Sequence, residues 1–233
     1  RACMTLSRRR LAQATALLAL PGLGLDTFAQ RAKDTLVLGM VLEPSPGLDP
    51  TTGAAAAIGE VVHYNVLEGL TKLTDSGAVL PLLATDWVSD PDGKTYTFKL
   101  RSGVRFQDGT PFNAEAVKFS FERAKAPDST NKAKKTVFDN ISSIATPQAD
   151  VVILTLNNPD ATLPFRLGEA PAVILSPKSA ATTATQPVGT GPFRLDSWQK
   201  GSAITLVRWD GFRDVAAIKL RRVTFRFIND NAA

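Results

Sequence analysis

The sequence predicts an α/β fold in which an inserted subdomain interrupts a central sheet. Three observations predict it. Strand-like runs occur near both ends of the 233-residue chain, two helical patterns lie between them, and the order of elements is strand, helix, hairpin, helix, strands, bridge and strands. The hydrophobic content of 44% and the charged content of 21% are ordinary for a globular protein, so composition alone excludes little.

The elements follow in order along the chain. Residues 34–41 (DTLVLGMV) predict a buried strand, and the prolines of the Glu43–Gly47 loop keep it extended or turned. A helix comes next, and Gly69 is placed to follow its last turn. The face that this helix is expected to bury comprises Ile58, Val61, Val62, Asn65 and Val66.

The clearest local pattern runs from Trp87 to Arg123. Pro91-Asp92-Gly93 predicts a turn, and residues 95–101 alternate between polar and apolar side chains as in a half-buried strand. A second turn at 108–111 precedes Asn113, the expected N-cap of a helix. Beyond this block we predict strands at 151–156, 172–175, 193–198, 204–209 and 223–228, a short helix near 162–167 and a low-complexity bridge at 179–186.

Residues 1–29 are predicted to be a secretory signal peptide. Three arginines at 8–10 precede a short apolar stretch, and Thr27 and Ala29 place small residues before a cleavage point. The stretch is shorter than the roughly 20 residues that span a bilayer, which disfavours an anchor. Residues 7–11 (SRRRL) also resemble a twin-arginine signal, and the general secretory route fits equally well. We therefore expect an exported protein.

The mature sequence gives no sign of nucleic-acid binding or of thiol chemistry. Removing residues 1–29 takes away four arginines and one aspartate, so the net charge falls from +5 to +2, which is too small for a nucleic-acid-binding surface. The basic run of Lys132, Lys134 and Lys135 is expected to be a solvated face. Cys3 is the only cysteine and lies in the predicted leader, so the mature chain has no disulfide and no cysteine metal site.

No catalytic, metal-binding or cofactor-binding set can be assembled from the remaining residues. His63 is the only histidine, and its apolar neighbours indicate a packed or surface residue rather than a general base. Gly189-Thr190-Gly191 lacks the phosphate-binding patterns and indicates a structural turn. The aspartates expected to serve in turns or caps rather than as metal ligands are Asp49, Asp86, Asp90 and Asp92. We therefore predict no cofactor, no metal and no enzymatic activity.

Four segments together resemble one protein family. Trp87–Arg123, with TYTFKL and GVRFQDGTPF in it, is similar to the signature region of the family 5 extracellular solute-binding proteins, the dipeptide- and oligopeptide-binding components of ABC importers. Leu48-Asp49-Pro50, Asn65–Leu70 and Gly189–Phe193 (GTGPF) match further family motifs in the family's order. The resemblance runs from about Leu36 to the end of the chain.

The resemblance implies a type II periplasmic-binding-protein fold and a division of the chain. Residues 30–56 and 188–233 would form the central sheet of the first lobe, and residues 57–187 its inserted subdomain. Family members are about twice as long as this sequence. It therefore resembles an N-terminal fragment in which the second lobe is missing.

The same resemblance implies a monomeric periplasmic protein that captures a small solute between two lobes and delivers it to the permease subunits in the membrane. Peptide is the default ligand, although relatives carry nickel complexes, oligosaccharides and opines. The loop before Leu48 would supply the first-lobe contacts, Glu43, Pro44, Ser45 and Pro46. Because the two prolines cannot donate hydrogen bonds, only carbonyls and the side chains of Glu43 and Ser45 remain, and a rigid loop without ligand contact is equally compatible.

Two other functions stay open at this stage. The lobe could serve as a ligand sensor for signalling or transcription, which would require a DNA-binding or membrane-spanning module, and the predicted signal peptide argues against the former. A secreted enzyme with its active site in the missing half is also compatible, because a fold does not fix a function.

Overall fold

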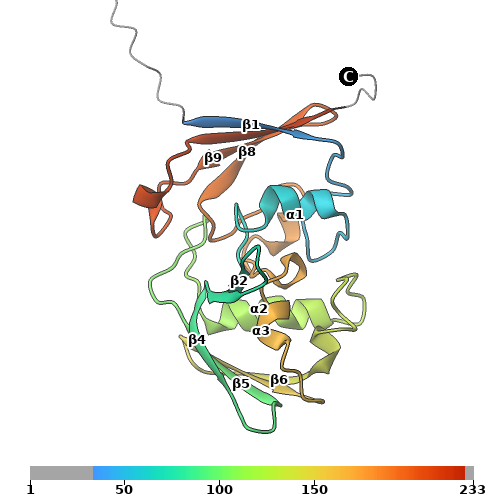
Figure 1. Ribbon diagram of the computed structural model, residues 1–233, viewed down its shortest axis with the longest axis vertical. Coiled ribbons are helices and arrows are strands. Elements are labelled where there is room, and N and C mark those ends of the chain that lie inside the picture. Colours follow the sequence, from blue (N-terminus) through green and yellow to red (C-terminus); the bar gives the residue numbers. More distant parts are fainter. Residues whose placement is uncertain (1–33, 229–233) are drawn as a thin grey trace, which may run out of the picture. The chain divides into compact units, whose positions relative to one another are not determined.

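The computed structural model describes residues 34–228, which belong to one compact unit (Figure 1). Its strands are β1 (Thr35–Met40), β2 (Thr71–Leu73), β3 (Val79–Pro81), β4 (Ala84–Ser89), β5 (Thr95–Leu100), β6 (Ile141–Gln148), β7 (Val151–Leu156), β8 (Phe193–Gln199), β9 (Ala203–Arg208) and β10 (Arg222–Phe227). Its α-helices are α1 (Ala56–Val62), α2 (Ala114–Lys125) and α3 (Leu163–Arg166). The predicted signal peptide lies outside the described residues.

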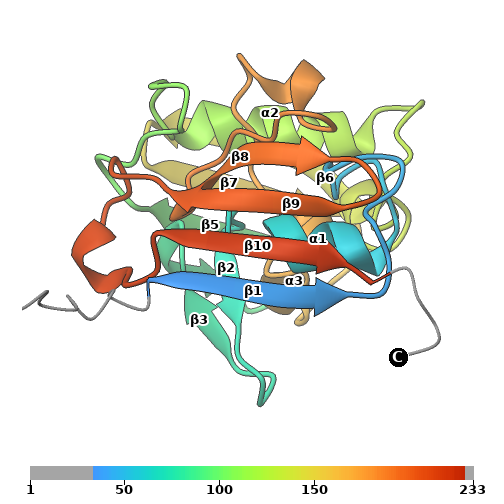
Figure 2. The ribbon, with the colours of Figure 1, turned by 90° about the horizontal axis from the view of Figure 1, so that it is seen from above.

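One four-stranded sheet joins the first and last parts of the described chain. Its order is β1-β10-β9-β8, with β1 parallel to β10 and the other pairs antiparallel. Figure 2 shows these four strands side by side. The strands predicted near both ends of the chain are thereby confirmed. Helix α1 packs beneath this sheet, where Ile58 and Val61 contact a core that includes Phe225.

The expectation that residues 34–41 form a buried strand is wrong in one respect. The strand forms, but Leu36 is 38% exposed, Val37 57% and Leu38 40%. The reason is position, because β1 pairs with β10 on one edge only and has no strand on its other edge among the described residues. The apolar residues of this segment therefore predicted the strand correctly, but the burial of its side chains depends on which elements pack beside it.

The second four-stranded sheet, β4-β5-β7-β6, contains the block that was clearest in the sequence. Tyr96, Phe98 and Leu100 of β5 point into the core, as the alternation predicted. Asn113 accepts a hydrogen bond from the backbone N–H of Ala116 and so caps α2, which also packs against the sheet (Figure 1). The predicted turn, strand, cap and helix of this block are all confirmed.

Three other local predictions need correction. Helix α1 ends at Val62, well before Gly69, because Tyr64 takes a left-handed backbone conformation that a helix cannot continue. The segment 172–175 is buried but is not a strand, since the N–H of Ile174 bonds to the Glu68 carbonyl and that of Leu175 to the Ser120 hydroxyl instead of to a ladder. Strand β6 was not predicted.

The described residues contain two hydrophobic cores. One lies between α2 and the β4-β5-β7-β6 sheet, and the other between α1 and the β1-β10-β9-β8 sheet. Since α1 packs on the latter sheet, a boundary at residue 57 would separate it from its own core, and the division at 57 and 187 stays a prediction. Within residues 34–228, no helix is both long and apolar enough to cross a bilayer.

Candidate functional site

The predicted ligand loop follows β1, at the edge where β1 and β10 both have their carboxyl ends. In open α/β sheets this is the edge at which ligands bind. The Glu43 carboxylate, however, is already bonded within the protein. It accepts from the Trp198 indole N–H at 2.7 Å and from the Gly201 backbone N–H at 3.0 Å, which ties the loop to the β8–β9 hairpin.

The rest of that loop offers little further chemistry. Pro44 is buried, whereas Ser45 and Pro46 are exposed and joined by a cis peptide bond. The structure therefore brings Glu43 to Trp198 rather than to open space, and leaves the Ser45 hydroxyl and backbone carbonyls as the groups that could meet a solute. Their role stays a prediction.

A small cavity lies beyond this loop, beside the buried carboxylate of Asp49. Asp49 accepts from the Thr51 backbone N–H at 2.8 Å and from the Arg123 guanidinium at 3.0 Å, and Arg123 also donates to the Thr51 hydroxyl. This network neutralises Arg123 and fixes it in the wall of a cavity of about 170 Å³. The lining residues are Thr52, Arg123, Ala126, Asp128, Ser129 and Thr130.

A larger cavity, of about 410 Å³, lies at the carboxyl end of α1 next to His63. The Nε2 atom of His63 is buried and has no hydrogen-bond partner. Burial lowers the pKa of His63 to about 4, against the opposing effect of the Gly168 carbonyl, so the ring is neutral at pH 7. The lining residues include Leu73, Asp75, Lys132 and Glu169.

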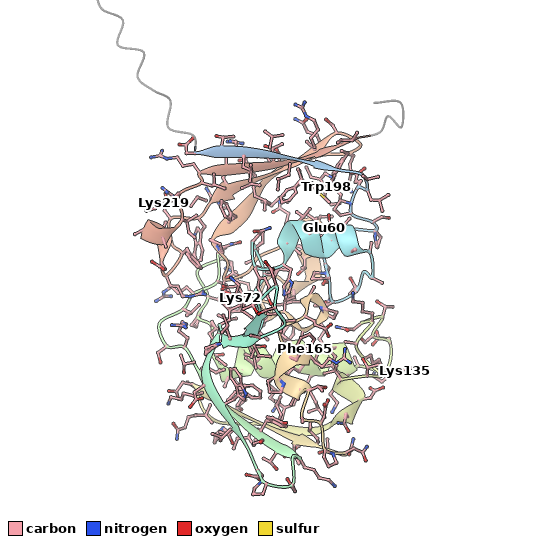
Figure 3. The ribbon with its side chains drawn as sticks, viewed as in Figure 1. Glu60, Lys72, Lys135, Phe165, Trp198 and Lys219 are labelled. Carbon is pink, nitrogen blue, oxygen red and sulfur yellow. The ribbon has the colours of Figure 1, made fainter. Side chains whose placement is uncertain are left out.

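Tyr64 forms the strained part of this cavity. Its φ of 61° is the only positive value at a non-glycine position among the described residues. Its hydroxyl holds it there by donating to the Gly168 carbonyl at 2.6 Å and accepting from the Leu73 N–H at 2.9 Å, and its ring stacks on His63 at 3.8 Å. Burial also raises the pKa of Tyr64. Lys72, labelled in Figure 3, lies with its ammonium 5.5 Å from the centre of the ring.

These two cavities, which we call the paired cavities, are lined in part by neighbouring residues of one loop. Residues 128–130 line the smaller one and Lys132 lines the larger, while Asn131 between them donates to the Pro171 carbonyl at 2.9 Å. Backbone strain, an unpartnered buried nitrogen and a perturbed pKa beside a cavity together mark candidate binding sites.

Sequence reasoning missed the paired cavities. His63 was expected only to be packed or exposed, and Lys132 to belong to a solvated face, yet both line the larger cavity. A single sequence carries no signal that Tyr64 would adopt a left-handed conformation. Among residues 34–228, no group of three or more histidine, cysteine or acidic side chains could hold a metal ion.

The chain is similar in sequence to proteins of known family. Residues 78–233 match the family model described as bacterial extracellular solute-binding proteins, family 5 Middle. The glutathione-binding protein GsiB of Escherichia coli K12 is 32% identical over 189 residues, which cover 79% of this chain and 36% of that protein.

Two solved structures are also similar. AgaA from A. tumefaciens R10, in complex with agropinic acid, is 31% identical with a TM-score of 0.78, over 84% of this chain and 40% of AgaA. The ABC transporter-associated periplasmic binding protein DppA of Helicobacter pylori, in complex with the peptide STSA, is 29% identical with a TM-score of 0.73, over 83% of this chain and 42% of DppA. The chain thus spans well under half the length of these relatives.

Proposed function

Because the chain belongs to the family 5 bacterial extracellular solute-binding proteins and has the type II periplasmic-binding-protein fold, we propose that it forms the first lobe of the solute-binding component of an ABC importer. The protein would act in the periplasm. There it would capture a small solute between two lobes and deliver it to membrane permease subunits, with no bond made or broken.

The match of residues 78–233 to the family is the observation that carries this proposal. The geometry supports it in a second way. The cavities of about 170 and 410 Å³ are lined by polar and charged groups that can hydrogen-bond a solute, and neither contains a nucleophile paired with a base.

We propose that the solute meets this lobe at the paired cavities and at the exposed part of the Glu43–Pro46 loop. The paired cavities offer Lys132 for a carboxylate and Asp75 or Asp128 for an ammonium group. Within the loop, Ser45 and the carbonyl of Pro46 are the available groups, since Pro44 is buried and Glu43 is bonded internally.

Peptide remains the default ligand. The named ligands of the relatives are glutathione, the peptide STSA and agropinic acid. We propose that this protein also takes a small polar solute with charged ends, and peptide fits that class.

The test uses the whole protein that contains this chain. It is titrated with glutathione, STSA and agropinic acid by calorimetry, and its thermal unfolding is followed at each ligand concentration. A true ligand at one hundred times its Kd should stabilise the protein by about 2.7 kcal/mol, with no product detected by mass spectrometry. Turnover of a bound compound would contradict the importer function.

A matched pair of variants tests the place of binding. Lys132→Ala should weaken binding of the identified ligand severalfold, because it removes a charged donor from the larger cavity. Lys135→Ala removes the same charge from the same loop outside the paired cavities and should leave the affinity unchanged (Figure 3). Equal effects of the two variants would show that the solute does not bind at the paired cavities.

A further inference from the structure

A second pair of cavities lies away from the proposed solute site, between two loops. One loop, residues 102–109, follows β5, and the other, residues 209–220, connects β9 to β10. In Figure 3 the second loop carries Lys219, on the side of the view opposite to Lys135. The cavities measure about 280 and 430 Å³ and share Gly103, Val104 and Arg213 in their walls, so we treat them as one cleft, the loop cleft.

Arg213 builds the wall of the loop cleft but carries no net charge into it. Its two terminal nitrogens donate to the carboxylate of Glu68 at 2.7 and 2.8 Å. Glu68 is buried and also accepts from the Thr190 hydroxyl at 2.7 Å. This bidentate pair fixes the 209–220 loop against the body of the protein.

Arg101 and Arg105 differ from Arg213 because no carboxylate neutralises them. The Nε atom of Arg101 donates to the Leu82 carbonyl at 3.0 Å, and a terminal nitrogen of Arg105 donates to the Gly109 carbonyl at 3.1 Å. Neither side chain takes part in an ion pair within residues 34–228. A carbonyl orients a guanidinium group without cancelling its charge. Both guanidinium groups are therefore held in place and keep further N–H donors for a ligand.

The two guanidinium groups line adjoining parts of the cleft. Arg105 lines the smaller cavity, Arg101 the larger, and Gly103 and Val104 border both. Trp209 and Phe106 add apolar wall on the Arg105 side. Asp214, which lines the larger cavity, is the opposing charge. With Arg213 and Glu68 cancelling, the lining groups leave a net charge of about +1, which favours an anion.

We propose that the loop cleft binds a small multivalent oxyanion, a polycarboxylate or a polyphosphate, with Arg101 and Arg105 as its two anchors. Guanidinium forks recognise both kinds of group through paired N–H donors. This site is separate from the paired cavities, and it does not depend on the identity of the imported solute.

The experiment titrates the whole protein with citrate and, separately, with inorganic pyrophosphate, at constant ionic strength, by calorimetry. Saturable binding of either probe is expected, and the stronger one identifies the source of the oxyanion. The double variant Arg101→Gln/Arg105→Gln should lose about tenfold or more of the affinity, because it removes two charged donors. Asp214→Asn should bind more tightly than the unmodified protein, because it removes the opposing charge.

A control separates a site from general attraction. Arg194→Gln/Arg226→Gln removes the same charge from exposed positions on β8 and β10, outside the loop cleft, and should leave the affinity unchanged. Circular dichroism confirms that each variant is folded. Absence of saturable binding by both probes, or an equal loss in the two double variants, would overturn the proposal. So would competition between the probe and the solute bound at the paired cavities.

Discussion

The two four-stranded sheets are built from similar strands but are covered to different degrees. In β4-β5-β7-β6, the central strand β5 has neighbours on both edges, and α2 helps to bury Phe98 completely. In β1-β10-β9-β8, the edge strand β1 leaves Val37 and Leu38 open. Strand β5 alternates polar and apolar residues, whereas β1 carries three consecutive apolar residues, so the more apolar strand is the more exposed one and the difference lies in their neighbours. Burial is therefore a property of place in the sheet.

The largest expected effect tests this difference directly. Phe98→Ala in β5 should lower the free energy of unfolding by about 3–5 kcal/mol, because it opens a cavity in a packed core. Leu38→Ala in β1 should cost less than about 1 kcal/mol, because that side chain is already half exposed. Urea denaturation of the two variants measures both values. A cost near 3 kcal/mol for Leu38→Ala would show that β1 is covered in solution.

The second prediction concerns the buried carboxylate of Glu68. Glu68 follows α1 in sequence, and its side chain bonds Thr190 and Arg213 on the segments flanking β8 and β9. Glu68→Gln should cost about 2 kcal/mol, below the full loss for a buried pair because Arg213 is partly open to solvent.

The matched control for that change is the exposed pair of Lys118 and Glu122 on α2. Lys118→Gln breaks an ion pair on the helix surface and should cost less than about 0.5 kcal/mol. Denaturation midpoints compare the two variants. Equal costs would mean that the buried pair does not hold the 209–220 loop.

The smallest expected effect depends on pH and concerns Asp108, in the segment between β5 and α2. Burial would raise the pKa of Asp108, but hydrogen bonds from Ser176, Thr110 and Ser179 hold it at about 2, below the ordinary value of 3.8. The carboxylate form is thus favoured by folding, and its contribution is present above pH 3.8 and lost as the pH falls towards 2. Because the Asp108 carboxylate is partly open to solvent, we expect it to contribute about 1 kcal/mol to the free energy of unfolding.

Asp108→Asn removes this titration. The difference in unfolding free energy between the unmodified protein and the variant should be largest near pH 6 and should shrink between pH 4 and pH 2, as followed by thermal denaturation. A difference that grows on acidification would contradict the assignment. Asp92→Asn, in an exposed turn, provides the control.

Local patterns predicted the fold where the physical cause is also local. The Pro91–Gly93 turn, the alternation of β5 and the Asn113 cap each depend on residues within one turn or strand, and all three are present. The segment 172–175 resembled a strand because it is apolar and contains two β-branched residues, but its N–H groups bond to the Glu68 carbonyl and to the Ser120 hydroxyl on α2. Strand β6 was not predicted because Ser142, Ser143 and Pro147 interrupt the alternation of apolar residues that marks a strand.

The candidate site depended even more on tertiary structure. The role proposed for Glu43 rested on a family resemblance, and the structure shows its carboxylate taken by Trp198, which lies 155 residues away in sequence. The cavity at His63 arises because Gly168 and Leu73 hold the Tyr64 hydroxyl, and no short-range pattern encodes such a meeting of three segments.

The parallel pairing of β1 with β10 has a consequence for the order of folding. Thr35 pairs with Arg222, so strands that touch are 187 residues apart (222 − 35), whereas the β4-β5-β7-β6 sheet draws on residues 84–156 alone. Closing a longer loop costs more entropy and delays the contact. The β4-β5-β7-β6 sheet can therefore form before the rest of the chain has been synthesised. Strand β1 leaves the ribosome before β10 and must wait, unpaired and apolar, for almost the whole described chain to be made.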